Sequence, residues 1–166
     1  MANYYSTEYN QDAQAPSLAL MLLKTFHLEA LPFTYTTPSA LAIGSVLHLR
    51  RLPAGDVWLF PILSRIQWTD MGTGTTIDIG YGAYKGYDGV EVAADDNLFD
   101  DDVDVAGAAG EAALGSDYTI AVTTTGTGQY KKFSSKDGVP IILTNASSTL
   151  ASGGTIDGYL IIGRAA

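Results

Sequence analysis

The sequence predicts an all-β protein: an antiparallel β-sandwich of the jelly-roll type with an extended N-terminal arm and one short helix. The first observation is the stretch Ser45–Tyr81, which reverses direction twice at turn-forming residues. The second is its last segment, where Thr75, Ile77, Ile79 and Tyr81 alternate with small or polar residues, as in a half-buried strand. The third is composition: 18 glycines, 10 tyrosines and only 16% charged residues, against about 25% in an average domain.

The elements follow in order along the chain. Ser17–Leu23 fits a short helix with Ser17 as N-cap, and Phe26–Thr36 fits a strand. The stretch Ser45–Tyr81 is predicted to hold three strands, separated by turns at Leu52–Asp56 and Met71–Gly74. Its middle strand, Val57–Trp68, is apolar on both faces, so both faces need a cover.

The second half returns to strands after an irregular region. Gly82–Asp104 is predicted to be irregular, and the alanines of Val105–Leu114 favour a short helix. A hairpin-type turn is expected at Lys136–Gly138. The predicted strands are Asp117–Thr125, Tyr130–Phe133, Val139–Thr144 and Thr155–Arg164.

The chain of 166 residues is interpreted as one domain, residues 17–166, preceded by an arm over residues 1–16. The arm is polar and shows no regular spacing of apolar residues, yet it carries three tyrosines. It is either a frayed terminus or an arm that docks on a neighbouring subunit with tyrosines as anchors. The candidate partner-binding residues are Tyr4, Tyr5, Tyr9, Trp58, Phe60 and Trp68.

Charge and composition exclude several classes of protein. The net charge of −9 opposes binding to a phosphate backbone, so no nucleic-acid partner is expected. The chain has no cysteine, which excludes disulfides and thiolate chemistry. The apolar run Leu18–Leu23 is too short to cross a membrane and lacks the basic flank of a secretory signal. Synthesis in the cytoplasm is therefore expected.

The sequence offers no motif for catalysis or cofactor binding. His27 and His48 lie in separate predicted strands, and no nucleophile motif accompanies them. Gly72–Gly74 lacks the further residues of a dinucleotide or phosphate loop. The acidic run Asp95–Asp104 is interpreted as a solvated loop, with a calcium site or a contact to a basic partner as alternatives. No catalytic residue, cofactor or tight metal site is predicted.

Three segments resemble the head decoration, or cement, proteins of tailed bacteriophages. They are the arm Ala2–Thr7, the strand and Leu-Pro-x-Gly turn of Gly44–Gly55, and Gly72–Tyr81 followed by an aspartate-rich loop. The resemblance covers roughly residues Met1–Ala113. It implies a jelly-roll sandwich, a homotrimer, and non-catalytic binding to the major capsid protein on the outside of the virion, near three-fold positions of the lattice.

The residues themselves also describe a subunit of an assembly: few charges, a strand that needs a second cover, and an arm bearing aromatic residues. The alternative is a carbohydrate-binding sandwich from a phage tail spike or fibre. In that case Tyr84, Tyr87, Trp58 or Trp68 would stack on sugar rings and would gather as a platform on one face.

Overall fold

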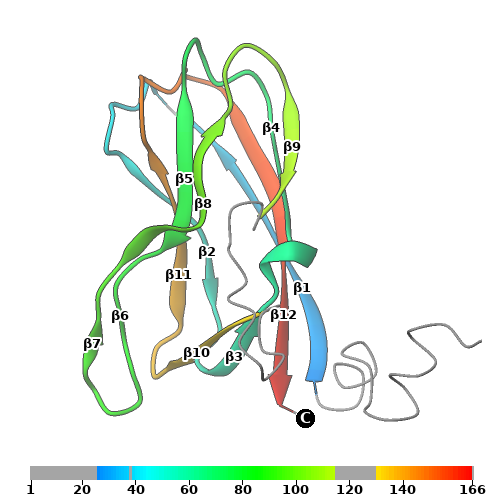
Figure 1. The fold of residues 1–166 in the computed structure, drawn as a ribbon, viewed down its shortest axis with the longest axis vertical. Helices are drawn as coiled ribbons and strands as arrows, with labels where there is room; N and C mark the ends of the chain where they lie inside the picture. Colours follow the sequence, from blue (N-terminus) through cyan, green and yellow to red (C-terminus); the bar gives the residue numbers. More distant parts are fainter. Residues whose placement is uncertain (1–25, 38, 115–129, 166) are drawn as a thin grey trace, which may run out of the picture.

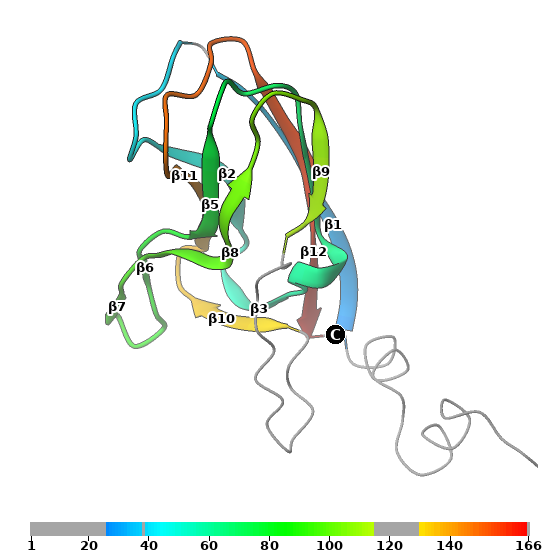
Figure 2. The same cartoon turned by 45° about the horizontal axis from the view of Figure 1, so that its top comes forward.

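The computed structural model describes residues 26–37, 39–114 and 130–165. These residues form two antiparallel sheets that face each other across a common core (Figure 1), and the turned view in Figure 2 shows the same two layers. The arrangement is an antiparallel β-sandwich of the jelly-roll type, as the sequence predicts.

The larger layer is a six-stranded sheet centred on β12. Along one edge, β12 pairs with β1 over its whole length, from Phe26 opposite Ala165 to Thr36 opposite Thr155. Two strands share the other edge of β12: β3 pairs with one part of it and β4 with another. Beyond them, β10 pairs with β3 and β9 pairs with β4. The strands are β1 (Phe26–Thr36), β3 (Gly55–Leu59), β4 (Arg65–Trp68), β9 (Gly110–Ala113), β10 (Lys131–Ser135) and β12 (Thr155–Ala165).

The second layer is a four-stranded sheet in the order β2-β11-β5-β8. All seven residues of β11 are buried, as expected for a central strand with both faces covered. Pro140, which cannot donate to a ladder, is the second residue of that strand and so lies close to its N-terminal end. The strands are β2 (Val46–Leu52), β5 (Thr76–Tyr81), β8 (Asp95–Asp104) and β11 (Val139–Asn145).

A short hairpin separates β5 from β8. It consists of β6 (Tyr84–Lys85) and β7 (Glu91–Val92), which pair with each other and project from the sandwich at the lower left of Figure 1. The base of the hairpin rests on a T-shaped aromatic cluster, in which the rings of Tyr81, Tyr84 and Phe133 lie 5.3 to 5.9 Å apart. The tip therefore extends from a rigid base.

The strand pattern places the core between the sheets. Ile77 and Ile79 of β5 are fully buried, which confirms the half-buried strand predicted from the alternation of this segment. From the other sheet, Leu160 and Ile162 of β12 are buried as completely. Phe99 of β8, in the same sheet as β5, is also fully buried. The predicted strands Phe26–Thr36, Val139–Thr144 and Thr155–Arg164 correspond to β1, β11 and β12.

The predicted strand Val57–Trp68 is wrong, because it is broken in two. A 3-10 turn at Pro61–Leu63 separates β3 from β4, with the N–H groups of Leu63 and Ser64 both donating to the carbonyl of Phe60. Pro61 has no N–H for a ladder and its φ suits the first position of such a turn. The turn shifts the alternation, so that the stretch Ser45–Tyr81 holds four strands instead of three.

The region after β5 also differs from the prediction. Gly82–Asp104 is not irregular but contains β6, β7 and the ten-residue strand β8. Charged side chains on β8 suit an edge strand, where they remain in water and discourage pairing with other chains. Val105–Leu114 contains β9 in place of a helix: Gly107 has φ of +68°, outside the helical region, and Gly110 receives the ring of Trp68.

The turn at Lys136–Gly138 does not join a hairpin. β10 belongs to the six-stranded sheet and β11 to the four-stranded sheet, so this turn carries the chain from one layer to the other. The predicted arm over residues 1–16, the predicted helix Ser17–Leu23 and the predicted strand Asp117–Thr125 lie outside the described residues. Within the described ranges, no helix has the length and apolar character needed to span a membrane.

Candidate functional site

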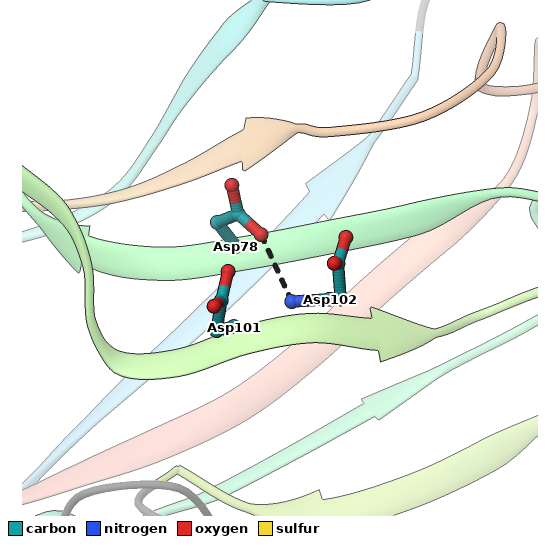
Figure 3. Close-up of side chains that lie close together, drawn as sticks. All are labelled: Asp78, Asp101 and Asp102. Carbon is teal, nitrogen blue, oxygen red and sulfur yellow. Dashed lines mark hydrogen bonds between the residues drawn. The ribbon is translucent and has the colours of Figure 1, made fainter.

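The edge strand β8 brings acidic side chains to β5. The pairing of the two strands is irregular: Ile77 lies opposite Val103, and Ile79 lies opposite Asp100. The extra β8 residue between these pairs lies in a bulge, where Asp102 adopts φ of +55°, the one positive φ of a non-glycine residue in the described ranges. The bulge directs Asp101 and Asp102 toward Asp78 of β5 (Figure 3).

The three carboxylates form an acidic cluster, defined here as Asp78, Asp101 and Asp102. One oxygen from each lies within 4.8 Å of the others. The Asp102 N–H donates to Asp78 Oδ1 at 3.0 Å, and Thr76 Oγ1 donates to Asp102 Oδ1 at 2.9 Å. These bonds hold the bulge in place, so that the carboxylates remain close despite their like charges.

Desolvation raises the pKa of Asp78 above the ordinary value of an aspartate, and the neighbouring charges of Asp101, Asp102 and Asp96 raise it further. The hydrogen bond from the Asp102 N–H acts in the opposite direction. The cluster thus favours a proton, a cation or a basic group of a partner. It supplies three carboxylates, whereas calcium takes six to eight oxygen ligands, so a cation bound there would keep much of its water.

This geometry corrects the predicted solvated loop. The aspartates of Asp95–Asp104 do not splay from an irregular segment; they lie along a bulged strand, and two of them meet a third aspartate from β5. Sequence reasoning identified the acidic run but missed Asp78. The available signal was the alternation that placed Asp78 on the wet face of β5.

Of the six predicted partner-binding residues, the three that the structure describes do not gather in one place. Tyr4, Tyr5 and Tyr9 lie outside the described residues. Trp58 is half-buried on the outer face of the six-stranded sheet, with Lys132 Nζ 5.2 Å from its ring centroid. Phe60 is 1% exposed and belongs to the interior, where its ring is 5.9 Å from that of Tyr130. Trp68 packs against Gly110, whose missing Cβ leaves room for the indole.

A network of charged groups surrounds Trp58. Lys132 forms an ion pair with Asp56 at 2.8 Å, and Ser134 Oγ donates to the same carboxylate at 2.6 Å. The hydrogen bonds from Lys132 and then Ser134 lower the pKa of Asp56. The network joins β10 to β3 on the outer face of the sheet, and exposure keeps its energetic value small.

The aromatic residues expected for sugar stacking do not gather on one face. Tyr84 belongs to the cluster at the base of the hairpin, and Tyr87 is 61% exposed at its tip. Trp58 and Trp68 lie on the six-stranded sheet instead, one on its outer face and the other against Gly110. The two histidines are exposed on different sheets, His27 on β1 and His48 on β2.

The outer face of the six-stranded sheet carries a shallow hollow that sequence reasoning did not identify. It measures about 410 Å³, and polar side chains from four strands line it, among them Arg65, Gln67, Glu111 and Asp157. A second hollow shares Gln67, Glu111 and Asp157 with the first. In the sequence, the sign of the first hollow is that its polar residues occupy alternate, outward-facing positions of their strands. These strands come together only in the fold.

Comparison with solved structures shows the same fold in capsid proteins of bacteriophages. A chain from the capsid of Ralstonia phage GP4 has a TM-score of 0.56 and 21% sequence identity, covering 86% of this chain and 87% of that one. A chain from the capsid asymmetric unit of cyanophage Pam1 has a TM-score of 0.51 and 10% identity, covering 98% and 91%. No protein-family model and no curated protein sequence matches this chain.

Proposed function

We propose that this chain is a structural protein of a tailed-bacteriophage virion, which binds the outer surface of the capsid as a decoration or cement protein. In this role it contacts the major capsid protein and further copies of itself, as a homotrimer. It stabilises the head through these contacts and catalyses no reaction.

The observation that carries the proposal is the match over nearly the whole length of both chains. The phage capsid chains are covered to 87% and 91%, so each is close in size to this protein and similar to it in fold over most of its length. Because one fold serves many functions, this support is by analogy. It agrees with the three segments of the sequence that resemble cement proteins.

The surface offers features that suit such a role. The tip of the β6–β7 hairpin carries Tyr87 and Val90, each 61% exposed. Exposed apolar side chains at the end of a projecting hairpin are suited to a pocket on another subunit. We assign attachment to this tip, to Trp58 and Trp68, and to the tyrosines of the arm, Tyr4, Tyr5 and Tyr9.

The proposal is tested by mixing the purified protein with phage heads that lack it and imaging the particles by cryo-electron microscopy. Added density of a sandwich near the three-fold positions, on the outside of the shell, is the expected result. Heads that already carry the protein provide the control, because their sites are filled. Unchanged heads at saturating protein concentration would refute a decoration role.

A further inference from the structure

Exposed apolar side chains lie on three adjoining elements around β12 of the six-stranded sheet. Among the described residues, eight large hydrophobic side chains are exposed, and four of them belong to three neighbouring elements, β1, the 3-10 turn and β12. These four are Leu28, Ile62, Leu63 and Tyr159, with exposed fractions of 38 to 48%. Together with the half-buried Ile161 they are called the β12 patch here.

The strand pairing explains how the β12 patch forms. Leu160 and Ile162 of β12 point into the core, so Tyr159 and Ile161 between them point outward. On β1, Leu31 and Phe33 are buried and Leu28 belongs to the opposite, outward set, where it lies opposite Gly163. Gly163 places no side chain directly opposite Leu28.

Two hydrogen bonds hold the 3-10 turn against the same part of β12. The Phe60 N–H donates to the Ile161 carbonyl, and the Ile161 N–H donates to Ser64 Oγ, both at 2.9 Å. Ile62 and Leu63, both exposed, therefore belong to a turn whose ends are bonded to the backbone of Ile161. Left in water, such a cluster of side chains is typical of a surface that another segment covers.

We propose that the apolar run Leu18–Leu23 of the same chain packs on the β12 patch. The run consists of Leu18, Ala19, Leu20, Met21, Leu22 and Leu23, without a polar residue. Like the β12 patch, the run is apolar, so it is stabilised when other side chains cover it. Only Lys24 and Thr25 separate it from β1, and β1 carries Leu28 of the patch.

The length of the connection makes this contact feasible. An extended chain advances about 3.3–3.6 Å per residue, and adjacent strands lie about 4.8 Å apart. The 3-10 turn lies two strand positions from β1, across β12, so a run that starts next to Phe26 reaches both Leu28 and Leu63.

The short connection to β1 also determines whether the run comes from the same chain or from another copy. A short flexible connection gives an effective concentration in the millimolar range, which exceeds the micromolar concentration of other copies in solution. The proposal therefore commits to contact within one chain. It does not depend on the proposed role in a virion.

The absence of native cysteine allows a direct test in the full chain. In the double variant Leu20→Cys with Leu63→Cys, mild oxidation is expected to form a disulfide within one chain, at least tenfold faster than in a control pair. The control is Leu20→Cys with Ile43→Cys, because Ile43 is 62% exposed in the loop before β2. That loop lies at the upper left of Figure 1, away from the 3-10 turn. Equal rates in both pairs, or a product linked between two chains, would overturn the proposal.

A second measurement avoids introduced thiols. Leu20→Asn with Leu22→Asn is expected to raise the fluorescence of a dye that binds exposed apolar surface several-fold, with unchanged circular dichroism; Ser17→Asn is the control. The increase should be lost when Ile62→Asn and Leu63→Asn are added, and an increase that persists would contradict the proposal. Both tests use isolated protein, so a failure to bind heads leaves their result unaffected.

Discussion

At the scale of single residues, Asp78 combines partial burial with the neighbouring charges of Asp101 and Asp102. Its pKa is raised in the folded protein, so the folded state holds the proton more tightly than the unfolded state does. The stability that this proton provides is present at low pH and is lost as the pH rises from 3.8 through the raised pKa. At neutral pH the ionised Asp78 therefore destabilises the fold.

Replacing Asp78 by asparagine should stabilise the protein at pH 7, because the amide oxygen can still accept from the Asp102 N–H while the like-charge repulsion is removed. Two like charges at about 4–5 Å in water cost about 1 kcal/mol, which corresponds to a rise of roughly 2–4 °C in melting temperature. The gain should vanish below pH 3.8. Thermal melts of Asp78→Asn from pH 3 to pH 8 measure it; a gain independent of pH would refute the electrostatic cause.

Gly80 shows how closely β5 and β8 approach each other. A Cβ at this position would lie 2.0 Å from the carbonyl oxygen of Asp95 and 2.5 Å from the backbone carbon of Asp96. Gly80→Ala should therefore destabilise the fold by about 3 kcal/mol or more, the upper end of the cost of overpacking. At Gly82, two residues along, the nearest atom is a side-chain carbon of Pro140 at 3.1 Å.

The matched control is therefore Gly82→Ala, which should cost clearly less, because a proline ring can shift more easily than backbone. Urea unfolding of both variants gives the comparison. Similar losses in the two variants would show that β8 can move away from β5.

At the scale of elements, β8 decides whether the acidic cluster binds calcium. The strand pairing fixes three carboxylates, but the bulge adds few further oxygen ligands, so we expect a dissociation constant on the order of 10⁻³ M. Isothermal calorimetry with calcium measures it, with Asp78→Asn as the control. A micromolar constant, or a melting temperature that falls by several degrees in chelator, would establish a metal site.

The β6–β7 hairpin should contribute to attachment and little to stability. Tyr87 and Val90 are exposed at its tip, whereas the base is held by Tyr81, Tyr84 and Phe133. Tyr87→Ser with Val90→Ser should change the free energy of unfolding by at most about 0.5 kcal/mol, as is usual for surface substitutions, and should reduce occupancy on heads at least tenfold. Equal occupancy with Lys85→Ser as control would exclude the tip from the contact.

The elements show which parts of the fold could be predicted. β1, β11 and β12 were predicted because their apolar residues and flanking turns are local signals. The break at Pro61 was missed because the 3-10 turn has apolar residues on both sides, so the apolar pattern continues through it. The strand β8 was missed because it depends on pairing with a distant strand. The acidic run was visible in the sequence, but the bulged register that adds Asp78 is non-local.

At the scale of the whole molecule, the exposed apolar surface predicts self-association. We expect a trimer, three times the 17.5 kDa chain, in light scattering at micromolar concentration. The expected contact involves the hairpin tip and the arm, so deleting residues 1–16 should weaken attachment while leaving circular dichroism unchanged. A monomer at these concentrations, or full occupancy of heads by the deleted form, would contradict this expectation.

The central position of β12 has a consequence for how the protein is made. The strand is synthesised after β1, β3 and β4, yet all three pair with it, and Phe26 meets Ala165. A nascent chain therefore cannot complete the six-stranded sheet until β12 has been synthesised. Such distant pairings fold in milliseconds to seconds, during which unpaired strands are exposed to other nascent chains. Truncated chains that lack β12 should consequently aggregate.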